Sequence, residues 1–309
     1  MPKHAILSGC GGGYDSYLGI PLRDKLLSQG IRPIMVNLSF EKKDVLDSHA
    51  KKGIISQLTS VCFCVDARAV LAVITCYFPE FYLSRALQQP VYIIHNGGTI
   101  GDIISAYEAV MARENVRFVE KLYLMEGGCD AVLAGSETKL GTPTEDMMHL
   151  RAVAQLRHVK QRFLCAVGMN IDTAHGVHPQ DLTDRLLDLD RRQVLVDRAL
   201  WSLADPDVQH YRDVVRQCRP VDSIINSLVC AALDGHRGFF TPEHLKTRIG
   251  EAVVPLTDLT CTMHTFDLDR LVASMDYLHR LQNDMTYADV DTFIKTTILP
   301  RNSARASGL

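Results

Sequence analysis

Near its N-terminus the chain carries an apolar run that ends in glycines, His4-Ala5-Ile6-Leu7-Ser8-Gly9-Cys10-Gly11-Gly12-Gly13-Tyr14-Asp15-Ser16. A short apolar run that stops at glycine is typical of a buried strand. Residues 16–29 follow with leucines at helical spacing and stop before Gly30, and residues 31–38 form a second apolar run. Residues 4–38 therefore predict a β-α-β unit, which favours a parallel sheet covered by helices.

The same alternation continues to about residue 167. We expect further strands at 61–65, 91–95, 121–125 and 162–167, and helices at 101–114 and 141–158. Residues 70–89 are expected to form a helical stretch interrupted near Pro79. The helix at 141–158 has a strong start, because Thr142 can cap it, Pro143 suits its first position and Glu145 completes a capping box.

After residue 170 the pattern becomes more helical. Helices are expected at 179–203, 222–233, 267–281 and 287–298, the last one capped by Thr286, and residues 253–266 read as strand-like or irregular. The sequence predicts an α/β, Rossmann-like protein with a mainly parallel sheet covered by helices on both faces and a more helical C-terminal third. Residues 1–300 are expected to form one domain and residues 301–309 a flexible tail.

Composition narrows the class of protein. Hydrophobic residues make up 47% of the 309 residues and charged residues 22%, and the formal charge is −3. These values favour a soluble globular chain with no overall attraction to nucleic acid or anionic membranes. No apolar run reaches the length of a membrane span, and nine cysteines in apolar contexts, including Cys62-Phe63-Cys64, indicate reduced thiols. We expect a cytoplasmic protein that binds a small molecule, and the sequence is compatible with homo-oligomers.

Three predicted strands end in glycine-rich turns, at residues 9–13, 96–98 and 126–128. In a parallel sheet these turns would share one edge, where ligands collect, and glycine lets backbone N–H groups approach an anion. Tight turns without a ligand are the alternative. The predicted ligand-binding residues are Gly9, Gly11, Gly12, Gly13, Asp15, Asn37, Ser39, Gly97, Gly127 and Gly128.

Acidic residues stand beside these turns. Glu126 is predicted to bind a metal ion, and Asp130 and Glu137 to act as general acid and base, because carboxylates at a strand edge suit both tasks. Asp15 could instead cap the first helix, and Glu145 could serve only its own helix. The sequence leaves the cofactor open, with a nucleotide and a divalent cation as the candidate.

Two histidine segments allow weaker hypotheses. His175-Gly176-Val177-His178 has the spacing of a zinc pair, although a zinc site needs further ligands and the histidines could simply bond to backbone groups. Asp234-Gly235-His236-Arg237 could bring an imidazole and a guanidinium into a site, or form a plain turn.

The first glycine turn has partial similarity to two nucleotide-binding motifs. Gly11-Gly12-Gly13-Tyr14-Asp15-Ser16 resembles the S-G-G-x-D-S loop of PP-loop ATP pyrophosphatases, with glycine in place of the first serine. The dinucleotide fingerprint G-x-G-x-x-G fails, because Tyr14 stands where the third glycine belongs and Asn37-Leu38-Ser39 ends the second strand where Asp or Glu would hold a ribose. Conventional NAD binding is therefore disfavoured.

Taken together, the chain resembles an uncharacterised domain-of-unknown-function family of Rossmann-like proteins. The resemblance rests on blocks that run in order through most of the sequence, including residues 9–15, 36–40, 77–83, 127–130, 135–137, 140–146, 223–227, 234–236 and 266–268. It implies a Rossmann-like fold and no assigned activity.

The leading hypothesis from the residues is an enzyme that binds a nucleotide or a phosphorylated small molecule at the C-terminal edge of its sheet. A non-catalytic ligand-binding or sensor protein, a PP-loop-like ATP-using enzyme and a structural scaffold are the alternatives. The prediction of a shared sheet edge fails if Asp15, Glu126, Asp130 and Glu137 lie far from residues 9–16.

Overall fold

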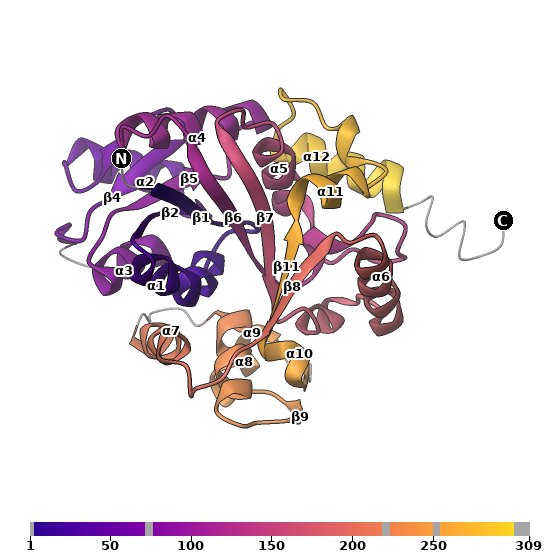
Figure 1. Cartoon of the computed structure of the whole chain (residues 1–309). Helices are drawn as coiled ribbons and strands as arrows, with labels where there is room; N and C mark the ends of the chain where they lie inside the picture. Colours follow the sequence, from indigo (N-terminus) through magenta and orange to yellow (C-terminus); the bar gives the residue numbers. More distant parts are fainter. Residues whose placement is uncertain (1–2, 72–76, 218–222, 250–253, 300–309) are drawn as a thin grey trace.

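A nine-stranded sheet forms the centre of the computed structural model, which describes residues 3–71, 77–217, 223–249 and 254–299 (Figure 1). Its middle consists of parallel strands in the spatial order β5 (Val91–His95), β2 (Ile31–Ser39), β1 (Lys3–Gly9), β6 (Val119–Gly127) and β7 (Val159–Val167). Antiparallel strands extend both sides: β4 (Cys62–Val65) and β3 (Ser56–Gln57) beyond β5, and β11 (Thr262–Asp267) and β8 (Leu195–Leu200) beyond β7.

Helices cover both faces of this sheet, because the buried side chains of its strands alternate between two apolar cores. In β1, Ala5 and Leu7 enter one core and Ile6 enters the other. The core with Leu7 is covered by α1 (Ile20–Ser28), α2 (Lys43–Lys51), α3 (Pro79–Leu87), α7 (Pro206–Gln217) and α8 (Ile224–Leu233). The core with Ile6 is covered by α4 (Ile100–Arg113), α5 (Thr144–Val153), α6 (Pro179–Arg191), α11 (Leu268–Ala273) and α12 (Tyr287–Phe293). The predicted α/β class and the two helical layers are confirmed.

Smaller elements complete the fold beside α8. They are the hairpin β9 (Gly238–Phe240) and β10 (Val254–Leu256), and the short helices α9 (Lys246–Ile249) and α10 (Asp258–Cys261). In Figure 1 they lie together with α7 and α8 below the sheet. Within the described ranges, none of the helices combines the length and apolarity that crossing a membrane requires.

Two local predictions are wrong. Residues 195–200 form β8 and not a helix, because α6 ends at Arg191, Gln193 takes a φ of 55°, and the following backbone pairs with the distant strand β11. Helix α5 begins at Thr144 without a side-chain cap, so the predicted capping box is absent. Thr142 instead bonds to Asp130, as described below. The Thr286 cap of α12 is confirmed as a capping box with Asp289. The expected tail at 301–309 lies outside the described residues.

The order of the strands creates one switch point in the sheet. From β1 the chain moves through α1 to β2 on one side, and it later returns to β6 on the other side of β1. The turns that follow β1 and β6 therefore diverge to opposite faces and leave a crevice between them, which is where open α/β sheets bind ligands.

Candidate functional site

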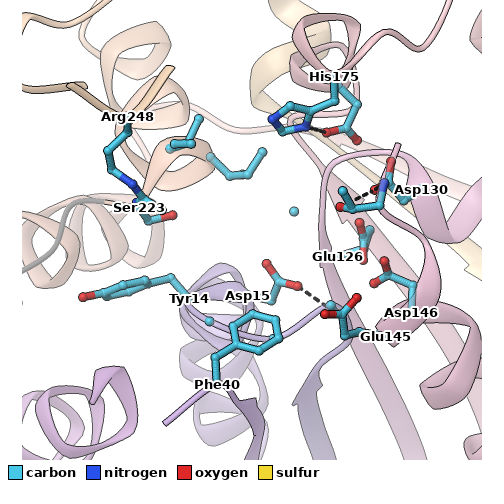
Figure 2. Close-up of a pocket in the computed structure, with 18 of the residues that line it drawn as sticks. Tyr14, Asp15, Phe40, Glu126, Asp130, Glu145, Asp146, His175, Ser223 and Arg248 are labelled. Atoms are coloured by element: carbon cyan, nitrogen blue, oxygen red, sulfur yellow. Dashed lines mark hydrogen bonds and ion pairs between the residues drawn. The ribbon is translucent and has the colours of Figure 1, made fainter. Parts of the chain in front are cut away.

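A cavity of about 380 Å³ lies at this switch point, beyond the carboxyl ends of β1 and β6. Its lining comes from the turn after β1, the turn after β6, the start of α5, the segment after β7 and the start of α8. Segments that are far apart in the sequence thus meet around one space (Figure 2).

The lining of the cavity is strongly acidic. Six carboxyl groups belong to it: Asp15, Glu126, Asp130, Glu145, Asp146 and Asp172. The basic side chains among the described lining residues are His175 and Arg248. Figure 2 shows Glu126, Asp130, Glu145 and Asp146 on one wall, and Arg248 with Ser223 on the wall opposite. The cavity thus has an acidic wall and an opposing wall that carries a guanidinium.

Backbone and hydroxyl donors hold several of these carboxylates in place. Oδ2 of Asp130 accepts hydrogen bonds from the Thr142 N–H at 2.7 Å and from the Thr142 hydroxyl at 3.2 Å. Oδ2 of Asp172 accepts one from the Cys129 N–H at 2.5 Å, and its Oδ1 lies 3.2 Å from Nδ1 of His175. Such anchoring of one oxygen fixes the direction in which the other oxygen points.

Three oxygens of the acidic wall have no hydrogen-bond partner, namely Oε2 of Glu126, Oδ1 of Asp130 and Oδ1 of Asp146. The three residues are only 3%, 5% and 3% exposed. Burying an ionised carboxylate without a partner costs several kcal/mol, and an orphan polar atom in a folded protein therefore calls for an explanation. A proton or a bound cation would supply the missing partner.

The pKa values of the carboxyl groups on the acidic wall are raised, because these groups are buried close to one another. Burial, together with the charge of Asp146, raises the pKa of Glu126 well above its ordinary range. Burial and the charge of Asp172 do the same for the pKa of Asp130. Burial also raises the pKa of Asp146 to about 6 and that of Glu145 to about 7. These carboxyls hold protons more firmly than usual as long as nothing positive lies between them.

The glycine turns make room for the carboxylates. A Cβ atom at Gly11 would lie 2.7 Å from Oδ1 of Asp146, and one at Gly127 would lie 2.8 Å from Oδ1 of Asp15. Two further glycines pack in the same way, Gly128 against Asp172 and Gly141 against Asp130. Contacts under 3.0 Å leave no space for a side chain, so the acidic wall depends on these glycines.

Much of the predicted site is found around this cavity. Gly11, Gly12, Gly13, Asp15, Glu126, Gly127 and Asp130 line it, and the predicted proximity of Glu126 and Asp130 to residues 9–16 is confirmed. Asp15 does not cap the first helix with its side chain; its Oδ2 accepts a hydrogen bond from the Gly11 N–H at 2.9 Å. Glu145 lines the cavity instead of capping α5.

Other predicted residues lie behind or away from the cavity. Gly9 and Gly128 pack against Asn37 and Asp172, while Ser39 is buried and its hydroxyl accepts a hydrogen bond from the Glu41 N–H. Gly97 follows β5, which β2 separates from β1. Glu137 is not part of the cavity lining, because its two carboxylate oxygens accept hydrogen bonds from the N–H groups of Ala134 and Gly135, each at 2.8 Å.

A buried polar network supports the first turn from below. The Asn37 side chain donates to the carbonyl of Gly13 at 2.8 Å and to Oε1 of Glu80 at 2.7 Å. On the other side of the turn, Nδ1 of His149 donates to the carbonyl of Cys10 at 2.7 Å. Asn37 therefore positions the loop instead of lining the cavity as predicted.

The histidine pair separates in the structure. His175 lines the cavity beside Asp172, whereas the His178 side chain accepts a hydrogen bond from the Gln180 N–H at the start of α6. Hydrogen bonding to Asp172 raises the pKa of His175. The two imidazoles do not form a common zinc site. His236 lies elsewhere, stacked on Phe240 with ring centres 4.1 Å apart.

Asp146 and Asp172 are the functional candidates that sequence reasoning left out of its predicted site. Asp146 follows the Gly141-Thr142-Pro143 start of α5, and Asp172 follows the carboxyl end of β7. A search for acids after every predicted parallel strand would have found Asp172. The wall that carries Ser223 and Arg248 comes from a segment with no local signal of a site.

Comparison with known proteins gives a family but no characterised relative. No curated protein matches the chain, and no solved structure matches it. The family model described as "Protein of unknown function (DUF1152)" matches residues 7–299, which include every residue of the cavity. This match confirms the resemblance to a domain-of-unknown-function family, and the chain belongs to the DUF1152 family.

Proposed function

We propose that this protein is a divalent-cation-dependent enzyme that acts on a nucleotide or another phosphorylated small molecule. The observation that carries the proposal is the set of partnerless oxygens on Glu126, Asp130 and Asp146 in a cavity at the switch point of the sheet. Carboxylate oxygens are the preferred protein ligands of Mg²⁺ and Mn²⁺. A phosphate group would be repelled by the acidic wall alone, and a cation on that wall would turn repulsion into attraction.

The opposite wall offers features that suit the remainder of such a substrate. Helix α8 begins beside the cavity, where Ser223 caps it by accepting a hydrogen bond from the Asn226 N–H at 3.2 Å. The amino end of a helix carries partial positive charge, and Arg248 adds a guanidinium on the same wall. These groups favour a substrate with more than one anionic group.

Aromatic rings at the cavity favour a planar group in the substrate. Phe40 is 41% exposed and Tyr287 is 37% exposed, although both are large apolar side chains. Both belong to the cavity lining. Exposed rings at a concave site can stack on a heterocycle such as a nucleobase, which supports a nucleotide over a simple sugar phosphate.

The chemistry that these residues can perform is proton transfer next to a phosphate. A bound divalent cation would supply Lewis acidity to a phosphoryl oxygen and acidify a water molecule. Glu145, with its pKa raised to about 7 by burial, is suited to give or accept a proton near neutral pH. Asp130, held by Thr142, keeps its other oxygen directed away from that anchor and without a protein partner.

The PP-loop alternative receives less support. In such a loop the backbone N–H groups would hold phosphates directly. Here the Gly11 N–H donates to Asp15, and the carboxylates of Asp15 and Asp146 lie against the turn. A cation-mediated contact agrees better with this charge distribution than a direct phosphate cradle does.

The test is a turnover screen of nucleotides and sugar phosphates with Mg²⁺ or Mn²⁺, comparing the wild type with Asp130→Asn and Glu108→Gln. Glu108 is exposed on α4, outside the cavity, and serves as the matched control. We expect cation-dependent phosphate chemistry in the wild type and the control, and a loss of at least a hundredfold in Asp130→Asn. Ligand binding without turnover for any substrate would instead favour the non-catalytic sensor hypothesis.

A further inference from the structure

We infer that the acidic wall holds two divalent cations, on two separate sets of ligands. The inference rests on the proposed function for its ligand chemistry, and its own support is how the donor atoms are grouped. The described part of the chain contains two trios of residues, Cys10 with Glu126 and Asp146, and Cys129 with Asp130 and Asp172. Within each trio the donor atoms lie within 4.8 Å of one another. All six residues are buried, and the trios share no member.

The first trio joins the ends of two strands and a helix. Cys10 follows β1, Glu126 belongs to β6 and Asp146 belongs to α5. Oε2 of Glu126 and Oδ1 of Asp146 have no hydrogen-bond partner. This trio therefore offers two buried oxygens to one cation, and Asp15 supplies a third carboxylate whose charge acts on both residues.

The second trio is built from the turn after β6 and the segment after β7. One oxygen of Asp130 is held by Thr142 and one oxygen of Asp172 by the Cys129 N–H. Oδ1 of Asp130 is the partnerless atom of this trio. Asp130 is anchored through one oxygen and keeps the other free for a cation, as cation ligands usually do, while Oδ1 of Asp172 lies beside Nδ1 of His175.

The three partnerless oxygens are divided between the trios. A single ion on Glu126 and Asp146 would leave the buried Oδ1 of Asp130 to a proton or to a second cation, and a second cation on Asp130 and Asp172 supplies that partner. The trios are neighbours, because Glu126, Asp130 and Asp146 line the same cavity and lie on the same wall of it (Figure 2). Paired cations about 3.5–4 Å apart are a known arrangement for clamping the two reacting oxygens of a phosphate.

The chemistry of the trios favours cations that prefer oxygen ligands. Each trio contains two carboxylates and one thiol. Carboxylate oxygens are the ligands that Mg²⁺ and Mn²⁺ prefer, whereas thiolates select softer ions. Mn²⁺ and Mg²⁺ therefore suit the carboxylates of the two trios, and Mn²⁺ is the practical probe.

The experiment titrates the full, metal-free chain with Mn²⁺ alone, by isothermal calorimetry and by native mass spectrometry. We expect two Mn²⁺ per chain in the wild type and in the Glu108→Gln control. Asp146→Asn and Asp130→Asn should each retain one Mn²⁺, because each removes a ligand from a different trio. A wild type that binds one Mn²⁺ or none would overturn the inference, whether or not the variants fold.

A second readout separates this inference from the proposed function. Two Mn²⁺ ions within a few ångströms couple magnetically, so the electron paramagnetic resonance signal of the doubly loaded wild type should fall below that of two isolated ions. Coupled ions without turnover of any phosphorylated substrate would support the two-cation site and refute the proposed enzymatic function. Turnover of a phosphorylated substrate with one bound ion would refute the two-cation site and support the proposed enzymatic function.

Discussion

Replacing Glu80 by glutamine should make the protein more stable at pH 8, even though Glu80 is buried and hydrogen-bonded. The carboxyl is fully buried on α3 beneath the first glycine turn, where Oε1 accepts a hydrogen bond from Asn37 and Oε2 has no partner. Burial raises its pKa from an ordinary value of 4.5 to about 7. The folded state therefore holds this proton more tightly than the unfolded state does.

The magnitude follows from the two pKa values. At 1.36 kcal/mol for each pH unit, the difference between 4.5 and about 7 corresponds to about 3 kcal/mol. This destabilisation is absent below pH 4.5, grows as the pH rises from 4.5 to about 7, and is complete above pH 7. Glu80→Gln keeps an acceptor for Asn37 and carries no charge, so it should gain up to about 3 kcal/mol at pH 8 and almost nothing at pH 4.

The assay is urea unfolding of the metal-free protein at pH 4, 6 and 8, if unfolding is reversible, with the midpoint and slope measured at each pH. Glu108→Gln, on the exposed face of α4, is the control and should change the free energy of unfolding by less than about 0.5 kcal/mol at every pH. A Glu80→Gln protein no more stable than the wild type at pH 8 would refute the reasoning. So would a gain in stability that does not depend on pH.

Three further outcomes are expected. Gly11→Ala should weaken Mn²⁺ binding at least tenfold while the metal-free fold persists, because the new Cβ atom would lie 2.7 Å from Oδ1 of Asp146. Calorimetry measures the affinity and circular dichroism checks the fold. An unchanged affinity would contradict this prediction. Phe40→Ala should raise the KM for a nucleotide substrate and leave the KM for the matching sugar phosphate unchanged, because the exposed ring would contact only the base. Equal changes in the two KM values would show that Phe40 does not stack on a base. Mn²⁺ affinity should increase as the pH rises from 5 to 8, because protons on Asp146 and Glu145, whose pKa values burial raises to about 6 and about 7, compete with the cation. An affinity that stays the same over this range would show that neither carboxyl is a ligand or a neighbour of the ion.

The local pattern of the sequence was sufficient to predict the central β-α-β unit and half of the acids on the acidic wall. An apolar run that ends at Gly9, a helix and a second run were enough to predict β1, α1 and β2, because each of these signals lies within a few residues. Glu126 and Asp130 were found in the same way, since they adjoin a glycine turn at the end of a predicted parallel strand. Parallel strands bring their carboxyl ends to one edge, and those two acids lie near residues 9–16 because β6 pairs directly with β1.

Only the tertiary structure decided which other acids face the cavity and what the glycines are for. Asp146 and Glu137 both follow the turn after β6, yet the chain folds so that Asp146 enters the wall and Glu137 bonds to its own loop. The pairing of β8 with β11 was equally hidden, because the two strands are far apart in the sequence and their register depends on backbone partners that no local pattern encodes. The glycines at 11, 127 and 128 look like an anion cradle in the sequence, whereas in the fold a Cβ atom at each of them would lie within 3 Å of a carboxylate from another segment. Steric contact between segments is a property of three-dimensional packing, and for that reason the sequence could point to the edge of the sheet but not to the charge that collects there.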